Sequence, residues 1–250
     1  MTITATYVGT ATVLLRVGEL TILTDPAFDP AGTTYELGPG EARRLADPAV
    51  DPSMLPAIDL VLLSHDEHPD NLDHTGRELL AHAGAVVTTT RGAGRLDGHA
   101  VGLDPWDVHT VAGVRITAAP ARHGPEGIEP IAGDVIGFVL ETSEGTLYIS
   151  GDTVYYDALD EIGRRFSVDV AFLHLGDARL PILGDVSLTM NGDQGARLTR
   201  SLGARTVVPV HFDAWAHFTE GRDRIVEAFE RAGLADRLRL LTPGTAEHLD

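Results

Sequence analysis

Short apolar runs mark the strands expected in the first part of the chain. Residues 3–8, 12–17 and 20–23 are rich in β-branched side chains, and a Gly-Glu pair separates the second run from the third. The run 59–63 is almost wholly apolar, and β-branched residues return at 85–90. These patterns predict strands, of which 59–63 is buried.

A long irregular segment interrupts this pattern. Residues 25–59 are dense in Pro, Gly and Asp and show little periodicity. Connections of this length are usually functional or mobile. Two interpretations stay open for it: a lid over a site, or a solvated excursion with a short helix near 41–46.

A helix is predicted directly after the buried strand. Apolar positions over 71–84 recur at helical spacing, with Asp70 or Asn71 as the expected cap and Gly84 as the stop. Its leucines would form the face that packs on the sheet.

The second part of the chain repeats the same order of elements. From about Ala100 to Thr146 the pattern is again β-rich, and helical and strand-like segments then alternate. We expect one α/β domain over 1–250, because a chain of this length can bury one large core, with two halves that meet near Ala100. The expected alternating elements are helices at 156–166, 192–203 and 221–233 and strands at 169–175, 205–210 and 237–241.

Composition narrows the function classes. Asp plus Glu number 37 against 19 basic residues, all of them arginine, and the net charge is −18. That field repels a phosphate backbone, so we expect a small-molecule substrate and no nucleic acid. Because the chain has no cysteine, any metal must be held by His, Asp, Glu or backbone groups. We expect no leader and no membrane segment, hence a cytoplasmic protein, and the oligomeric state is undefined by the sequence.

Potential metal ligands follow four of the expected strands. They lie in "LLSHDEHPDN", "AAPARHGP", "LYISGDT" and "VVPVHFD", each directly after an apolar run. A lone histidine is usually an ordinary hydrogen-bonded residue, and Asp after Gly usually belongs to a turn. In this order, however, His, His, Asp and His at strand ends would form two adjacent cation sites that share a carboxylate.

These motifs resemble the metallo-β-lactamase fold hydrolases, over nearly the whole chain. "ATYVGTATVLLRVGELTILTDPAF" is similar to the opening strands and "DP" turn of the ascorbate-phosphate lactonase-like branch. "VLLSH", "PARHGP", "SGDT" and "VPVHFD" resemble the ordered ligand motifs of the family. The resemblance implies a four-layer αββα sandwich of two similar halves, with the metals at one edge between the two sheets.

The same resemblance implies a cofactor and its ligands. One or two zinc ions are expected, with manganese or iron as alternatives. Asp70 is also implied as the group that orients or deprotonates the attacking water. The implied ligands are His65, His68 and His123 for the first metal, Asp152 as the bridge, and Asp70 and His211 for the second metal.

The first motif departs from the family pattern by one residue. The family has histidine, any residue, histidine or glutamate, any residue, aspartate, histidine, whereas this chain has one residue too many between His65 and Asp70. The second ligand is therefore either His68 or Glu67. With His68 the donor set suits zinc and hydrolysis; with Glu67 it is harder and suits iron or manganese, as in the flavodiiron branch. We favour His68, because a long glutamate side chain is readily accommodated as a solvated neighbour.

Asn71 is the second departure from the family motif. It occupies the position where the family usually has another histidine of the second metal site. The second metal then binds loosely, or His174 or His217 compensates, or one metal suffices. We interpret both histidines as packing or support for the ligands rather than as ligands. For Asp25 and Asp73, which lie in family-like stretches, we expect turn capping and orientation of ligands.

The sequence thus predicts a metal-dependent hydrolase whose metal-bound water attacks a carbonyl centre. Cleavage of a lactone, ester, thioester or amide is the first expectation. A phosphodiesterase comes second, because the acidic chain offers no evident phosphate clamp. A diiron oxidoreductase with Glu67 as ligand is the alternative from another class, and a non-catalytic binding protein fits poorly with so complete a ligand set.

Overall fold

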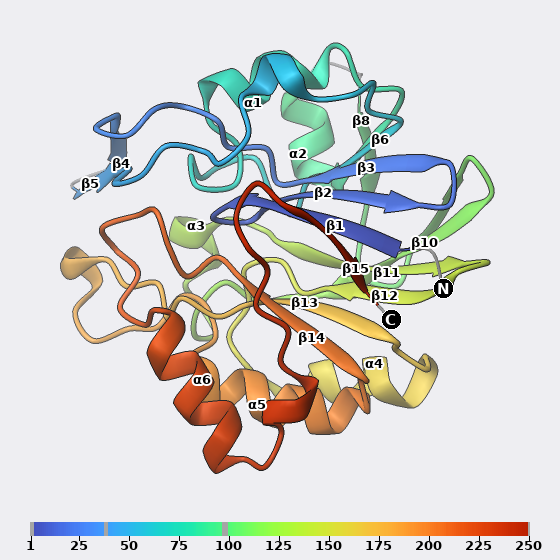
Figure 1. Cartoon of the computed structure of the whole chain (residues 1–250). Helices are drawn as coiled ribbons and strands as arrows, with labels where there is room; N and C mark the ends of the chain where they lie inside the picture. Colours follow the sequence, from blue (N-terminus) through green and yellow to red (C-terminus); the bar gives the residue numbers. More distant parts are fainter. Residues whose placement is uncertain (1–2, 38–39, 97–99, 250) are drawn as a thin grey trace.

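The computed structural model describes residues 3–37, 40–96 and 100–249, and its elements form four layers (Figure 1). Two β-sheets pack face to face in the middle, and helices cover the outer face of each sheet. The expected α/β fold, a four-layer αββα sandwich, is confirmed.

The first sheet is built mainly from the N-terminal half. Among the described residues its seven strands run in the order β15-β1-β2-β3-β6-β7-β8. Strands β1 to β3 are antiparallel, whereas β3, β6, β7 and β8 are parallel. The bounds are β1 (Ile3–Gly9), β2 (Thr12–Val17), β3 (Leu20–Thr24), β6 (Leu60–Leu62), β7 (Val86–Thr89), β8 (Ala100–Leu103) and β15 (Ala246–Leu249), with α1 (His74–Leu80) and α2 (Thr90–Arg95) outside.

The second sheet follows the same plan. In the described part of the chain its six strands run in the order β14-β13-β12-β11-β10-β9, antiparallel from β9 to β12 and parallel from β12 to β14. The bounds are β9 (Val108–Val111), β10 (Val114–Pro120), β11 (Ile136–Thr142), β12 (Gly145–Ile149), β13 (Val170–His174) and β14 (Thr206–Val210), with α4 (Asp160–Arg165), α5 (Gly192–Leu202) and α6 (Arg222–Arg231) outside and the short α3 (Glu129–Ala132) between strands.

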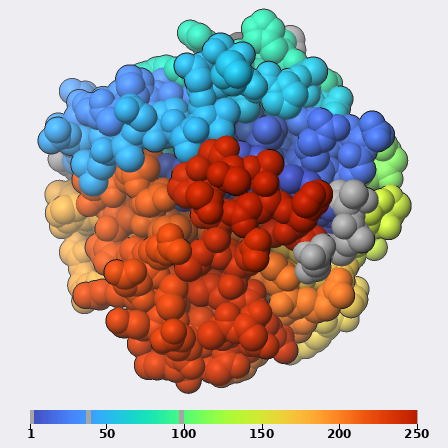
Figure 2. Space-filling model, viewed as in Figure 1, coloured from blue at the N-terminus to red at the C-terminus, as the bar shows by residue number. Residues whose placement is uncertain are grey.

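One apolar layer joins the two sheets. Ile22 and Leu62 of the first sheet and Phe138 and Phe172 of the second belong to the same buried cluster. Burial of such a side chain contributes about 1.5–3 kcal/mol, so this layer holds the sheets in fixed register. The C-terminal residues, red in Figure 2, lie across the boundary between the blue N-terminal part and the orange part. This follows from the pairing of β15 with β1.

The segment 25–59 contradicts one local expectation. It contains the hairpin β4 (Thr34–Leu37) and β5 (Gly40–Arg43), so the short helix near 41–46 is wrong. Arg44, which follows β5, is fully buried, and its backbone forms a β-bridge with Trp215. Backbone hydrogen bonds to another loop hold this part extended, since Leu45 N donates to Ala214 O and Ala216 N donates to Arg43 O, while most of the described side chains between residues 30 and 59 stay exposed.

Two further local expectations are wrong. The first helix begins at His74 and ends at Leu80, because its cap is Asp73, which accepts a hydrogen bond from Gly76 N at 2.7 Å. The strand at 237–241 is absent. This segment forms only a β-bridge between Leu238 and Val207, and the C-terminal strand is β15 instead. Within the described residues, no helix is both long and apolar enough to cross a bilayer.

Candidate metal centre

Three imidazole rings meet where β6 and β10 end. His65 Nε2 lies 2.9 Å from His68 Nδ1, and His123 Nε2 lies 3.1 Å from the same nitrogen. His65 and His123 are buried, and His68 is partly exposed. We call these three residues the imidazole cluster.

The outer nitrogens of two of these rings are tied back into the fold. His123 Nδ1 donates to the carbonyl oxygen of Leu188 at 2.8 Å, and Ser64 Oγ lies 3.0 Å from His65 Nδ1. Since a carbonyl oxygen only accepts, the proton of neutral His123 is on Nδ1 and its Nε2 lone pair faces the cluster. Burial holds the pKa of His65 well below its usual range and lowers the pKa of His68 to about 4. Neutral nitrogens crowded together in this way fit a divalent cation.

The bend in the first motif decides which side chain joins the cluster. The backbone bends at Asp66 and Glu67, so the residues after His65 do not continue as a strand. Glu67 turns away and pairs with Arg95 at 2.5 Å, and Asp66 pairs with the same guanidinium. The structure therefore brings His68 to the cluster, and Glu67 lies outside it.

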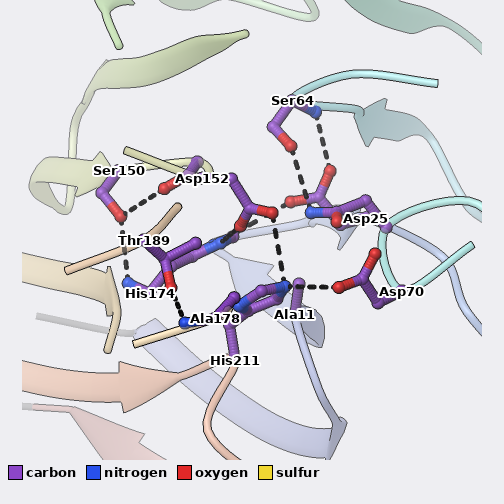
Figure 3. A network of polar contacts seen from close by, with 12 residues as sticks. Ala11, Asp25, Ser64, Asp70, Ser150, Asp152, His174, Ala178, Thr189 and His211 are labelled. Atoms are coloured by element: carbon purple, nitrogen blue, oxygen red, sulfur yellow. Dashed lines mark hydrogen bonds and ion pairs between the residues drawn. The ribbon is translucent and has the colours of Figure 1, made fainter. Parts of the chain in front are cut away.

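A second group of ligand candidates lies beside the first, and Figure 3 shows four of its side chains, those of Asp70, Asp152, His174 and His211. Asp152, after β12, accepts a hydrogen bond from His174 Nδ1 at 2.7 Å, and its other oxygen lies 3.4 Å from His211 Nε2. Asp70 Oδ2 lies 3.2 Å from the same His211 nitrogen and 2.9 Å from His217 Nε2. We call these five residues the carboxylate cluster.

Opposite charges balance one another in the carboxylate cluster. Burial opposes ionisation of Asp70 and Asp152, but their histidine neighbours outweigh it and hold the pKa of each carboxyl well below its usual range. Burial also opposes protonation of His211, yet the two carboxylates raise its pKa to about 8. A proton on His211 therefore supplies part of the positive charge that a bound metal cation would supply.

The two clusters touch at Asp152. Its Oδ2 lies 3.7 Å from His123 Nε2 of the imidazole cluster and 3.4 Å from His211 Nε2 of the carboxylate cluster. The described residues thus hold two groups able to bind a metal, one of His65, His68 and His123 and one of Asp152, His174 and His211.

This geometry agrees with sequence relationships. The sequence pattern of the family described as "Beta-lactamase superfamily domain" matches residues 21–212. The chain belongs to the beta-lactamase superfamily. A UPF0173 metal-dependent hydrolase of Exiguobacterium sp. is 30% identical in an alignment 249 residues long that covers 96% of this chain and 97% of that protein. A second such hydrolase, from Pelotomaculum thermopropionicum, is 29% identical over 76% of this chain and 82% of its own.

Solved structures of other proteins share the fold. An isothiocyanate hydrolase from Delia radicum gut bacteria has a TM-score of 0.84 at 23% identity and covers 98% of both chains. The diiron β-hydroxylase CmlA from Streptomyces venezuelae has a TM-score of 0.72 at 17% identity, over 99% of this chain and 54% of that one. The prediction of a metal-dependent hydrolase is confirmed at the level of the family, and the lactonase-like branch stays a prediction.

In this member of the superfamily, Asn71 lies between the two carboxylates. With its amide oriented to satisfy both groups, the side-chain nitrogen is 3.2 Å from Asp152 Oδ2 and 3.3 Å from Asp70 Oδ1. In this orientation Asn71 donates to both candidate ligands, and it is fully buried. His174 and His217, which we expected to support ligands rather than to be ligands, hydrogen-bond the carboxylates of Asp152 and Asp70.

Asp25 and Asp73, the two other residues for which we expected a supporting role, lie outside both clusters. Asp25 accepts a hydrogen bond from Ser64 N at 2.7 Å, and burial raises the pKa of Asp25 to about 8. Its other oxygen is 3.9 Å from His174 Nε2. Asp73 caps α1 and pairs with Arg44 at 3.4 Å, so it holds the loop that carries the first motif.

Sequence reasoning missed three groups that position the ligands. Ser64 adjoins His65 in the chain and could have been suspected from that adjacency. The carbonyl of Leu188 and the guanidinium of Arg95 left no sequence signal, because any residue supplies a carbonyl and Arg95 lies 28 positions from Glu67.

Proposed function

We propose that this hydrolase cleaves a lactone, ester, thioester or amide bond of a small molecule, using two adjacent zinc ions. The observation that carries the proposal is the position of Asp152, whose Oδ2 lies within 3.7 Å of a nitrogen from each cluster. A carboxylate so placed can serve two cations at once.

The residues present fit such a pair of ions. His65, His68 and His123 would hold the first, and Asp152, Asp70 and His211 would hold the second, with His174 and His217 as further nitrogen donors in reach. When bound, such cations lower the pKa of water and polarise a carbonyl group.

The chain's own residues orient the reaction. Asp70 lines a small cavity at the clusters together with His68, His123 and His217. Hydrogen bonds from His211 and His217 keep the pKa of Asp70 low, and both rings fix its carboxylate. An ionised carboxylate at the cavity can orient a water molecule and accept its proton, the role we propose for Asp70.

The choice of zinc rests on the donor set. His68 belongs to the imidazole cluster and Glu67 is paired with Arg95, so the cluster contains only nitrogen donors. Such a donor set suits zinc, whereas diiron sites are rich in carboxylates. The diiron alternative needs Glu67 as a ligand, and its pairing with Arg95 argues against that. A cytoplasmic location remains a prediction of the sequence.

A direct test uses protein freed of metal by chelation and reloaded with zinc, manganese or iron. Neutral aryl esters and lactones should be hydrolysed fastest by the zinc form, and bis(p-nitrophenyl) phosphate should be cleaved slowly. Asp70→Asn should abolish ester hydrolysis. Faster cleavage of the phosphodiester, or oxygen consumption by the iron form without hydrolysis by the zinc form, would contradict the proposal.

A further inference from the structure

The cavity at the clusters has one apolar wall. Besides His68, Asp70, His123 and His217, its lining consists of Ala178, Leu180 and Leu188. The free space is about 20 Å³, room for about one water molecule. A larger substrate group that enters from the side of Leu180 therefore lies against this wall.

The wall belongs to a loop that is fixed at both ends. Leu188 N donates to Ala178 O at 2.8 Å, and Asp177 N donates to Met190 O at 3.0 Å. Leu188 also supplies the carbonyl that holds His123, which ties the base of the loop to the imidazole cluster. Between these anchors the chain projects outward through the short 3-10 helix Pro181–Leu183.

The projecting part is apolar and partly exposed. Leu180 is half-buried. Ile182, which lies between Pro181 and Leu183 in the chain, has 58% of its surface exposed. The sequence "LPIL" thus continues from Leu180, which lines the cavity, into three further apolar residues. Runs of apolar residues at the surface are typical of binding sites.

The arginines close to this opening are already engaged. Arg179 pairs with Asp177 at 2.9 Å and also with Asp185. Arg122 lies over the ring of Tyr156, 4.4 Å from its centroid, and pairs with Glu126. Among the described residues that line the cavity there is no arginine, whereas Asp70 is present. An anionic substituent lying against Leu180 would therefore meet an apolar wall that offers it no guanidinium.

We infer that the substrates of this hydrolase carry an uncharged, apolar substituent next to the scissile bond, and that Leu180 is the specificity-determining residue on which it packs. The inference rests on the proposed function, since it describes the substrate class of that same site. It selects neutral acyl or aryl compounds over phosphorylated or carboxylated ones.

The test measures binding, so it does not require turnover. Hydroxamates bind metal through their head group, and their acyl chains can be varied independently. Titration calorimetry on the zinc-loaded protein with acetohydroxamic, butyrohydroxamic and hexanohydroxamic acid should show affinity rising by up to about fourfold per buried methylene. Succinic acid monohydroxamate, in which a carboxylate replaces the terminal methyl group of butyrohydroxamic acid, should bind at least about tenfold more weakly than that compound.

Variants assign the effect to the wall. Leu180→Asp should remove most of the gain with chain length, and the milder Leu180→Ala should reduce it. Met54→Asp is the matched control, since Met54 is 76% exposed and does not line the cavity, and it should keep the wild-type series. Circular dichroism and zinc content establish that each variant is folded and loaded.

The outcomes separate the two proposals. Any one of four results would overturn the inference. Two concern the unmodified protein and its ligands: equal affinity for all three acyl chain lengths, or equal affinity for succinic acid monohydroxamate and butyrohydroxamic acid. The other two are the absence of binding by any hydroxamate and an unchanged dependence on chain length in both Leu180 variants. Ester hydrolysis by the same preparation would then leave the proposed function standing. A steep series without hydrolysis of any ester or lactone would support the apolar site and contradict the proposed reaction.

Discussion

The imidazole cluster and the carboxylate cluster lie side by side but satisfy their buried polar groups in opposite ways. In the imidazole cluster, three ring nitrogens face one another at 2.9 and 3.1 Å with a proton on His68 Nδ1 as their shared donor, and a cation in its place would bind all three lone pairs. In the carboxylate cluster, Asp70 and Asp152 already accept hydrogen bonds from protonated nitrogens.

This difference predicts unequal affinity. A cation entering the carboxylate cluster must displace the proton of His211, whose pKa is raised to about 8, and the amide hydrogens of Asn71. A cation entering the imidazole cluster displaces neither, because burial keeps the pKa values of His65 and His68 low. We therefore expect the imidazole cluster to bind its ion more tightly at neutral pH.

Removal of Asp152 should have the largest effect, because it is the residue that the two clusters share. Asp152→Ala should lower hydrolysis by more than about 100-fold, beyond the range for groups that only orient a ligand. Ester hydrolysis and metal content by elemental analysis measure this in one preparation. Unchanged turnover and stoichiometry in a folded variant would refute the two-metal arrangement.

The pair His68→Ala and Glu67→Gln tests the composition of the imidazole cluster. His68→Ala removes one of three nitrogen donors and should weaken the tighter ion by more than about 100-fold, whereas Glu67→Gln should cost less than about tenfold. Competition with a chromogenic zinc chelator gives both affinities. If Glu67→Gln proves the more damaging change, the iron-type assignment replaces ours.

Stepwise chelation should separate the clusters by thermal stability. A ligand at 100 times its Kd stabilises the folded state by about 2.7 kcal/mol, which for a chain of this size is about 5–10 °C in Tm. Loss of the tighter ion should give the larger decrease and loss of the weaker ion the smaller one, as followed by calorimetry at increasing chelator. Two equal steps would show that the clusters do not differ.

Asn71→His should narrow the difference between the clusters. The substitution replaces a donor between Asp70 and Asp152 by a potential nitrogen ligand, so the weaker binding step should tighten by about tenfold, about 1.4 kcal/mol. Isothermal titration with zinc resolves the two steps. Two equally tight sites already present in the unmodified protein would mean that His174 or His217 completes the second site.

The sequence predicted the layers better than the details of the loops. Strands such as 59–63 carried an unambiguous apolar signal, and ligand motifs at their ends identified the edge where the clusters lie. The spacing in the first motif left Glu67 and His68 open, because the decision depends on Arg95, far along the chain. Contacts of this kind are set by tertiary packing and leave no local pattern.

The helix cap and the hairpin were mispredicted for related reasons. Asp70 and Asn71 are good capping residues, but Asp70 is bound by two histidines and the cap falls to Asp73. Residues 41–46 have helix-forming composition, yet Leu45 N donates to Ala214 O at 2.7 Å and holds the segment extended. In both places a distant contact outweighs local propensity.

The pairing of β15 with β1 has a consequence for synthesis on the ribosome. The strand that covers the outer edge of β1, Ala246–Leu249, emerges about 240 residues after β1 itself. Until then the nascent chain presents an unpaired edge strand, which can template association with a neighbouring chain. Polysomes hold nascent chains close together, so the open edge of β1 can meet that of a neighbouring chain before the two halves of the protein have closed on each other.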